Sequence, residues 1–285
     1  MNFSYLSLDQ FKSSGVAHIP KADHDTRLRQ LLEHVSQEVD RHTRRHFYSV
    51  TQTRYLSGTG AARLLLPDDL ISVTTLKEDA DRDGIYEVTW AATDYELWPY
   101  DAAPAGGLAL ARPYRALEVN RRSNGTQDVF LRGQRQYELA GQWGYCHCTE
   151  DTGAVINEGA EFSTADTTLT VADGSNIEVG HTLLIDSEQL YVQGRVTEGG
   201  SDLTVARGVH GTTAAAHANG SAISRLVYPG PIVEATLMQA ARLWTRRVAG
   251  YAREIGFTVT GQMQPVTGLD DDVKQMLQTY MVPSL

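Results

Sequence analysis

Four residues in the first third of the sequence have the spacing of a calcium-binding loop. Asp79, Asp81, Asp83 and Gly84 spell DxDxDG, which supplies oxygen ligands at the first, third and fifth positions of such a loop. The twelfth position, which should supply a bidentate Glu, is Trp90, and the flanking segments have the character of strands rather than helices. A β-turn explains the same residues, because Asp caps its own backbone in such turns. We therefore favour the turn, and weak Ca²⁺ binding stays open as the one cofactor that the sequence suggests.

Cysteine and histidine do not complete another metal site. The two cysteines, Cys146 and Cys148, flank His147, but a tetrahedral zinc site needs four ligands, so we interpret them as ordinary strand-end residues. His42 and His46 stand four residues apart on a predicted helix and share one of its faces. Since no third ligand is evident, a solvated helix face is the better interpretation of that pair.

The sequence carries no signature of a known catalytic centre. It has no GxxxxGKS/T phosphate loop, no GxSxG elbow and no HExxH helix, and the pair Asp68–Asp69 falls in a polar loop. We therefore expect a protein that is not an enzyme. The net charge of −10 disfavours tight binding to nucleic acid or to anionic membranes. No apolar stretch is long enough to cross a bilayer, and the first residues do not resemble a secretory signal, so we expect the protein to stay where it is made.

The first element that the sequence predicts is a helix from about Asp25 to His46, with Asp23 or Asp25 as its N-cap. Its apolar residues recur at helical spacing and form one stripe. They are Leu28, Leu31, Leu32, Val35 and Val39. The opposite face carries charged side chains. They are Arg27, Arg29, Glu33, Glu38, Arg41, Arg44 and Arg45. Solvation and a contact between subunits explain that face equally well.

The stretch from about Tyr48 to Tyr145 is predicted to be rich in strands. Residues 57–60 predict a hairpin turn, and Asp83–Gly84 predicts a second one. Further strands are predicted at three places. These are residues 116–120, 128–131 and 137–144.

The rest of the chain is predicted to form a small β domain followed by helices. Residues from about 149 to 226 are rich in Thr, Ser, Gly and Ala and contain short strand-like runs between Gly-containing turns. A helix is then predicted from Pro231 to Val248, and Gly250 stops it. Asp270 to Asp272 place negative charge at the start of a last helix, where the helix dipole favours it.

These elements together predict an α+β fold. In it, N- and C-terminal helices pack with a small antiparallel sheet, and an all-β domain is inserted. The expected division is a core of residues 1–148 with a helix and a sheet, an inserted β domain of residues 149–227, and the rest of the core with the C-terminal helices at residues 228–285.

Several segments resemble the head–tail connector, or adaptor, proteins of tailed bacteriophages. Arg44–Tyr48 is similar to a helix-ending segment of that family, and residues 64–79, LLLPDDLISVTTLKED, are similar to the run that follows it. Residues 137–145, which end in GQWGY, resemble a family strand, and residues 231–247 resemble its C-terminal helix. The similarity covers about residues 25–148 and 228–282, which is roughly two-thirds of the chain.

The resemblance implies a structural protein of the virion neck, made in the host cytoplasm. It implies a ring of about twelve copies that binds beneath the portal, joins capsid to tail and surrounds passing DNA without reading its sequence. The implied partners are other copies of the chain, the portal protein and a tail terminator or stopper protein. The family docks to the portal through its C-terminal segment, although a frayed terminus is the simpler interpretation. That segment is Tyr280, Met281, Val282, Pro283, Ser284 and Leu285.

Residues 150–226 depart from the usual adaptor, which runs almost directly from the GQWGY-like strand into the helix. This insert is similar to a small β module of other phage structural proteins, and outward decoration, tail docking and packing against the capsid vertex stay open as its role. An alternative function is a calcium-dependent binding or adhesion module of a virion, which DxDxDG and the insert suggest. A hydrolase using scattered carboxylates and histidines is a further alternative.

Overall fold

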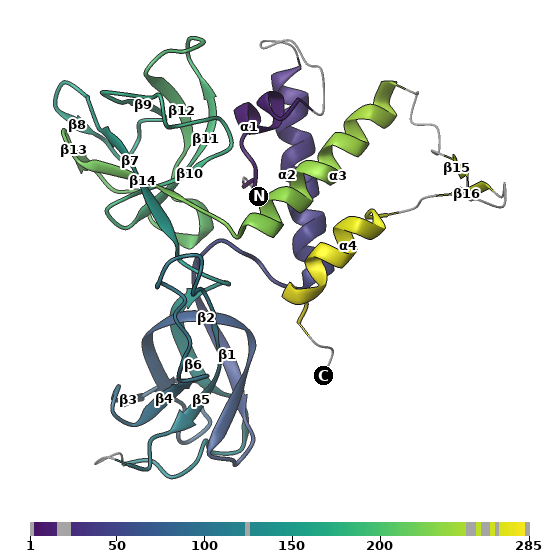
Figure 1. The fold of residues 1–285 in the computed structure, drawn as a ribbon. Helices are drawn as coiled ribbons and strands as arrows, with labels where there is room; N and C mark the ends of the chain where they lie inside the picture. The colour runs from purple at the N-terminus through teal and green to yellow at the C-terminus, as the bar shows by residue number, and fades with distance from the viewer. Residues whose placement is uncertain are drawn as a thin grey trace. The chain divides into compact units, whose positions relative to one another are not determined.

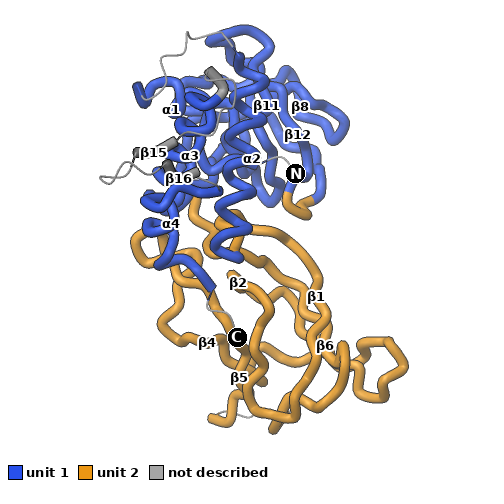
Figure 2. Tube along the Cα trace, turned by 90° about the vertical axis from the view of Figure 1, so that its right-hand side faces the viewer, with its two compact units in different colours: residues 1–44, 150–209, 213–285 blue, residues 45–149, 210–212 orange. Residues whose placement is uncertain are grey.

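The computed structural model describes residues 3–15, 24–122, 126–248, 255–257, 263–265 and 268–282. The chain divides into two compact units (Figure 2). Unit 1 comprises residues 1–44, 150–209 and 213–285, and unit 2 comprises residues 45–149 and 210–212. Figure 1 labels the helices and strands of both.

The fold is mainly β, so the predicted α+β class with terminal helices packed on a small sheet is wrong. The described residues form two six-stranded sheets and two two-stranded sheets, and only about 22% of the chain is helical. The helices do not flank a small sheet, because each large sheet buries its own apolar side chains in its own cluster. Such a sheet needs no helical layer to cover it.

Unit 2 contains the first large sheet, whose strand order is β1-β6-β2-β5-β4, with β3 paired to β2. Its strands are β1 (Val50–Gly58), β2 (Arg63–Glu78), β3 (Val88–Trp90), β4 (Tyr95–Trp98), β5 (Tyr114–Val119) and β6 (Gly133–Trp143). The predicted hairpin at residues 57–60 is wrong, because β6 lies between β1 and β2 and pairs with both. The second hairpin is confirmed, since Glu78 pairs with Val88 around the loop that holds Asp83–Gly84. Residues 128–131 form no strand.

Aromatic side chains fill the interior of unit 2. The rings of Trp90 and Phe130 stack with centroids 4.9 Å apart, and Tyr137 meets both edge-on. Trp143 is fully buried at the end of β6. Edge-to-face and offset-stacked contacts of this kind add to the energy of burying large apolar surfaces.

Unit 1 contains the four α-helices, α1 (Leu8–Ser13), α2 (Asp25–Thr43), α3 (Gly230–Val248) and α4 (Asp271–Leu277). The helix α2 begins after His24, which supplies no side-chain cap, so Asp25 lies in the first turn and is not the N-cap. It ends at Thr43 because Arg44 adopts the left-handed conformation, three residues before the predicted end. The helix α4 begins at Asp271, as the run of three aspartates predicts, and the side chain of Asp270 caps it by accepting the N–H of Asp272. The predicted residues Asp23 and Gly250 lie outside the described residues.

The helices of unit 1 pack on one another through the stripe that the sequence predicts for α2. Leu28, Leu32 and Val35 share one buried cluster with Ala240 and Ala241 of α3 and with residues of α1. None of the described helices is long and apolar enough to span a membrane.

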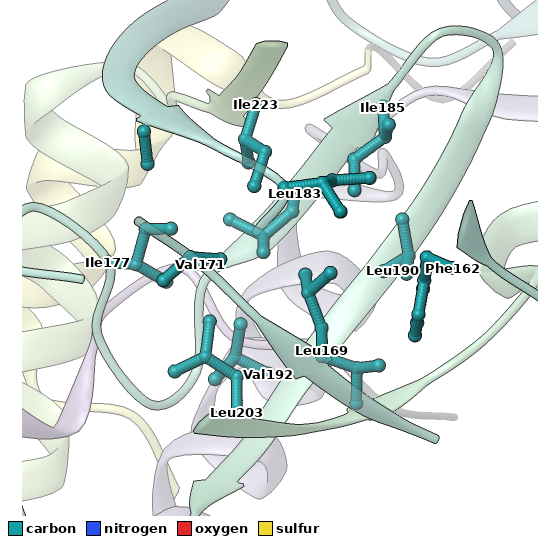
Figure 3. Packing of buried hydrophobic residues seen from close by; sticks show 13 residues of the cluster. Phe162, Leu169, Val171, Ile177, Leu183, Ile185, Leu190, Val192, Leu203 and Ile223 are labelled. Atoms are coloured by element: carbon teal, nitrogen blue, oxygen red, sulfur yellow. The ribbon is translucent and has the colours of Figure 1, made fainter. Parts of the chain in front are cut away.

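Residues 149–226 form the second large sheet, with the strand order β7-β14-β10-β11-β12-β9 and a separate β8–β13 pair. The strands are β7 (Thr149–Val155), β8 (Glu161–Phe162), β9 (Thr168–Thr170), β10 (Thr182–Ile185), β11 (Glu188–Arg195), β12 (Asp202–Ala206), β13 (His217–Ala218) and β14 (Ala222–Leu226). Leucine, isoleucine and valine side chains of these strands and loops face one another in a buried core, which Figure 3 shows from close by. The shorter elements are η1 (Val209–Gly211), η2 (Gln278–Tyr280) and the pair β15 (Ile255–Phe257) and β16 (Met263–Pro265).

Candidate functional site

The acidic loop between β2 and β3 brings together the residues that the sequence predicts as cation ligands. Asp79, Asp81 and Asp83 lie beside Glu87. Each of the four residues has one carboxylate oxygen in a group of four oxygens that all lie within 4.8 Å of one another. An ion at the centre of such a group would lie near the 2.3–2.6 Å that Ca²⁺ prefers from oxygen. Asp79 is buried, and the other three carboxylates are exposed.

The backbone of the acidic loop is folded around Asp79. Its carboxylate accepts the N–H groups of Arg82 at 2.7 Å, of Asp83 at 3.2 Å and of Gly84 at 2.9 Å. Gly84 has a φ of 92°, which a residue without Cβ adopts at little cost. These are the backbone-capping bonds of an Asp-rich turn.

Glu87 is the ligand candidate that the sequence analysis did not name. It occupies the ninth position of the calcium-loop pattern, which supplies a ligand in such loops, often through a water molecule. Its Oε1 accepts the N–H of Ala80 at 2.8 Å, which folds it back over the loop. Trp90, at the twelfth position, instead donates its indole N–H to Glu78 at 2.9 Å in the core.

The predicted portal-docking segment is described as far as Val282. Tyr280 ends η2 and is half-buried, whereas Met281 is exposed. The N–H of Val282 donates to the carbonyl oxygen of Thr43, the last residue of α2, at 3.1 Å. Pro283, Ser284 and Leu285 lie outside the described residues.

The cysteines and histidines that the sequence analysis weighed as metal ligands form no group of ligands among the described residues. Cys146 and Cys148 are buried and free, and burial raises the pKa of the Cys146 thiol. His147 lies between them in sequence, but its Nδ1 is 2.8 Å from the hydroxyl of Ser49. His42 lies within α2 and His46 lies beyond its end, so the two do not share one helix face.

The pair Asp68–Asp69 makes ion pairs rather than an acid–base pair. The carboxylate of Asp69 is buried, 3.0 Å from Arg45 and 3.4 Å from Arg115. Burial raises its pKa, and the two guanidinium groups oppose that rise. Asp68 pairs with Arg54.

A buried charged network in the insert carries no sequence motif that we identified. Glu188 is fully buried and accepts two bonds from Arg207, at 2.7 and 2.8 Å. It also accepts the N–H groups of Gly208 and Ala215. His217 lies between two carboxylates, with Nε2 2.9 Å from Glu188 and Nδ1 2.7 Å from Asp186.

This network holds the segment of residues 207–217 against the β10–β11 hairpin. Burial raises the pKa of Glu188, but the bonds from Arg207, Ala215, His217 and Gly208 outweigh it and lower the pKa to about 2. The carboxylate is therefore charged at neutral pH, and it compensates the positive charge of the buried Arg207.

Comparison with models of known protein families and with curated proteins finds no match to this chain.

Proposed function

We propose that the chain is a structural head–tail adaptor of a tailed bacteriophage. It assembles as a ring beneath the portal, joins capsid to tail and surrounds the DNA channel. The observation that carries the proposal is the resemblance of residues 25–148 and 228–282 to that family. Those two segments contain α2, the unit 2 sheet, α3 and α4, and α2 packs against α3 although about 200 residues separate them in sequence.

The negative net charge of the chain supports the proposal that DNA passes through the ring without binding tightly to it. The net charge is −10, so a ring built from many copies has a strongly negative average potential. Such a potential repels the phosphate backbone and leaves DNA free to slide.

The structure of the C-terminal segment supports its proposed role as the contact to the portal. Its backbone is tied to the end of α2 by the bond from Val282 to Thr43, and this bond leaves Met281 exposed. An exposed large apolar side chain on an anchored backbone is a good docking element, because little conformational entropy is lost on binding.

A chain that ends after Tyr280 is expected to keep its fold and to bind the portal about tenfold more weakly, since a few anchor residues carry most of an interface's energy. Native mass spectrometry and negative-stain imaging of the chain mixed with portal measure this. The full chain should form a ring stacked coaxially on the portal. Thermal unfolding of both chains is the control for folding. A full-length chain that stays monomeric and ignores the portal would contradict the proposed function.

We propose binding of a divalent cation at the acidic loop as a second candidate function. The observation in its favour is the approach of four carboxylate oxygens from Asp79, Asp81, Asp83 and Glu87 to within 4.8 Å of one another. Four carboxylates near one another repel, and a hard cation with oxygen preference would relieve that repulsion.

Calcium at about ten times its dissociation constant is expected to raise the free energy of unfolding by about 1.4 kcal/mol, through preferential binding to the folded state. Thermal unfolding with Ca²⁺ and with a chelator measures the shift. The variant D81N/D83N should lose the shift, whereas D271N/D272N, which removes the same charge from exposed positions of α4, should keep it. If Ca²⁺ stabilised both variants equally, the stabilisation would come from general screening of the net charge and not from binding at the acidic loop.

A further inference from the structure

The helix α2 has a basic stripe on the side opposite its buried residues. We give this name to Arg27, His34 and Arg41, which are all exposed. They are seven residues apart, so they lie within a narrow arc of the helix, and about 21 Å of helix separates the first from the last. Leu28, Val35 and Val39 face the other way, into the core.

The two arginines of the basic stripe are not neutralised within the part of the chain that the structure describes. Arg29, on a neighbouring face, pairs with Glu33 at 2.6 Å. Arg27 and Arg41 have no carboxylate within ion-pair distance among the described residues. The nearest carboxylate to His34 is Glu38, at 3.8 Å. The stripe therefore presents positive charge to solvent on a chain whose net charge is −10.

The insert has the opposite charge. Residues 149–227 contain eleven carboxylates and three arginines, a formal net charge of −8, which is most of the charge of the whole chain. Each arginine is engaged inside the insert. Arg195 donates to the carbonyl oxygens of Gly174 and Ile177, Arg207 pairs with Glu188, and Arg225 pairs with Glu150.

Three exposed carboxylates surround the buried network of the insert. We call Glu161, Asp166 and Asp186 the acidic end. Glu161 is in β8, which pairs with β13 through Phe162 and His217. The carbonyl oxygen of Asp166 accepts a bond from Arg207 at 3.1 Å, and Asp186 contacts His217. All three residues therefore lie beside the Glu188 network, and their side chains are exposed to solvent.

We infer that the basic stripe of one copy docks on the acidic end of the insert of the next copy. The contact joins two unlike surfaces of the same chain, so it is heterologous, and repetition about an axis closes a ring. The inference rests on the proposed adaptor ring and assigns the open role of the insert to contact between neighbours. We commit to a second copy as the occupant because of local charge complementarity, since the insert carries a formal net charge of −8 and exposes three carboxylates at its acidic end.

The experiment uses the full chain mixed with portal, with rings counted by native mass spectrometry and negative-stain imaging. The variant R27E/R41E is expected to reduce the fraction of portals that carry a complete ring by about tenfold at low salt, because each contact changes from attraction to repulsion. The variant E161R should reduce it in the same direction, and R27E/R41E/E161R should recover part of the loss. High salt should weaken the wild-type ring, since exposed charges are screened.

The matched control is R121E/R122E, which makes the same change in charge at exposed positions of unit 2 and should leave the ring intact. Thermal unfolding of each variant shows whether it is folded. A ring that forms equally well with R27E/R41E overturns the inference and leaves the adaptor function standing. Loss of DNA retention by R27E/R41E with an intact ring also overturns it and makes DNA the occupant. A wild-type chain that forms no ring on the portal overturns the adaptor function and this contact together.

Discussion

Replacing Glu188 by Gln is expected to lower the free energy of unfolding of the insert by about 3–5 kcal/mol, because it leaves the buried guanidinium of Arg207 without its counter-charge. The side chain of Glu188 is fully buried, and the side chain of Arg207 is 7% exposed. Glutamine has nearly the same shape, so the change removes charge and one acceptor without opening a cavity. Its amide group would also place N–H donors where Arg207 and backbone N–H groups now donate.

Denaturant unfolding, followed by hydrogen exchange in β10 and β11, measures this loss. The control is E150Q, which removes the same charge from an exposed pair with Arg225. Surface ion pairs of that kind contribute about 0–1 kcal/mol, so E150Q should be close to wild type. Equal and small losses in both variants would show that Arg207 and His217 do not depend on Glu188.

The same residue predicts a dependence on pH. The pKa of Glu188 is about 2 in the folded chain, against a usual value of 4.5. A carboxyl group with a lowered pKa stabilises the folded state above its unfolded pKa, and that stabilisation disappears as pH falls through the folded value. The difference in stability between wild type and E188Q should therefore shrink between pH 4.5 and pH 2.

The sequence predicts those helices and strands whose signals lie within a few consecutive residues. The stripe of α2, the acidic start of α4 and the strand runs of the insert are all found near their expected positions. Helical spacing, side-chain capping and short runs between glycines are properties of a few consecutive residues, so one sequence contains them in full.

Pairing between distant strands is the property that the sequence does not reveal. The strands β1 and β2 are joined by a short turn, yet β6 lies between them and arrives from about 80 residues later in the chain. The assignment of α+β failed for a related reason. It assumed that the α2 stripe covers the sheet that follows it, but the stripe meets α1 and α3, and the sheet of unit 2 is filled by Trp90, Phe130 and Tyr137.

The two candidate sites differ in the same respect, because one is local in the sequence and the other is assembled by the fold. The carboxylates of the acidic loop lie within nine residues, and the ninth position of the DxDxDG pattern points to Glu87. In the network of Glu188, Arg207 and His217, the first and last residues are 29 positions apart with no fixed spacing, and the turns of the insert bring them together. No rule of spacing identifies three such residues as partners, because the partnership is made by the fold.

Replacing Trp143 by Ala is expected to destabilise unit 2 by about 3–5 kcal/mol, the usual loss when a fully buried aromatic side chain is truncated and a cavity remains. Trp143 ends β6, the strand that pairs with both β1 and β2, and it stands opposite Val50 and Leu70. Its indole N–H donates to the carbonyl oxygen of Gln52 at 3.0 Å, and the guanidinium of Arg54 lies over its ring at 4.3 Å.

Hydrogen exchange in β1, β6 and the insert measures where this loss falls. Because unit 2 has its own apolar cluster, protection should fall in residues 50–58 and 133–143 and should persist in the strands of the insert. The variant W143F separates the two contributions, since it keeps most of the buried ring but removes the hydrogen bond to the exposed Gln52, a loss of about 1 kcal/mol. The control is W98A, at a half-buried position of the edge strand β4. An equal loss of protection in the insert would mean that the two units unfold as one, and the two clusters would then share a single cooperative transition.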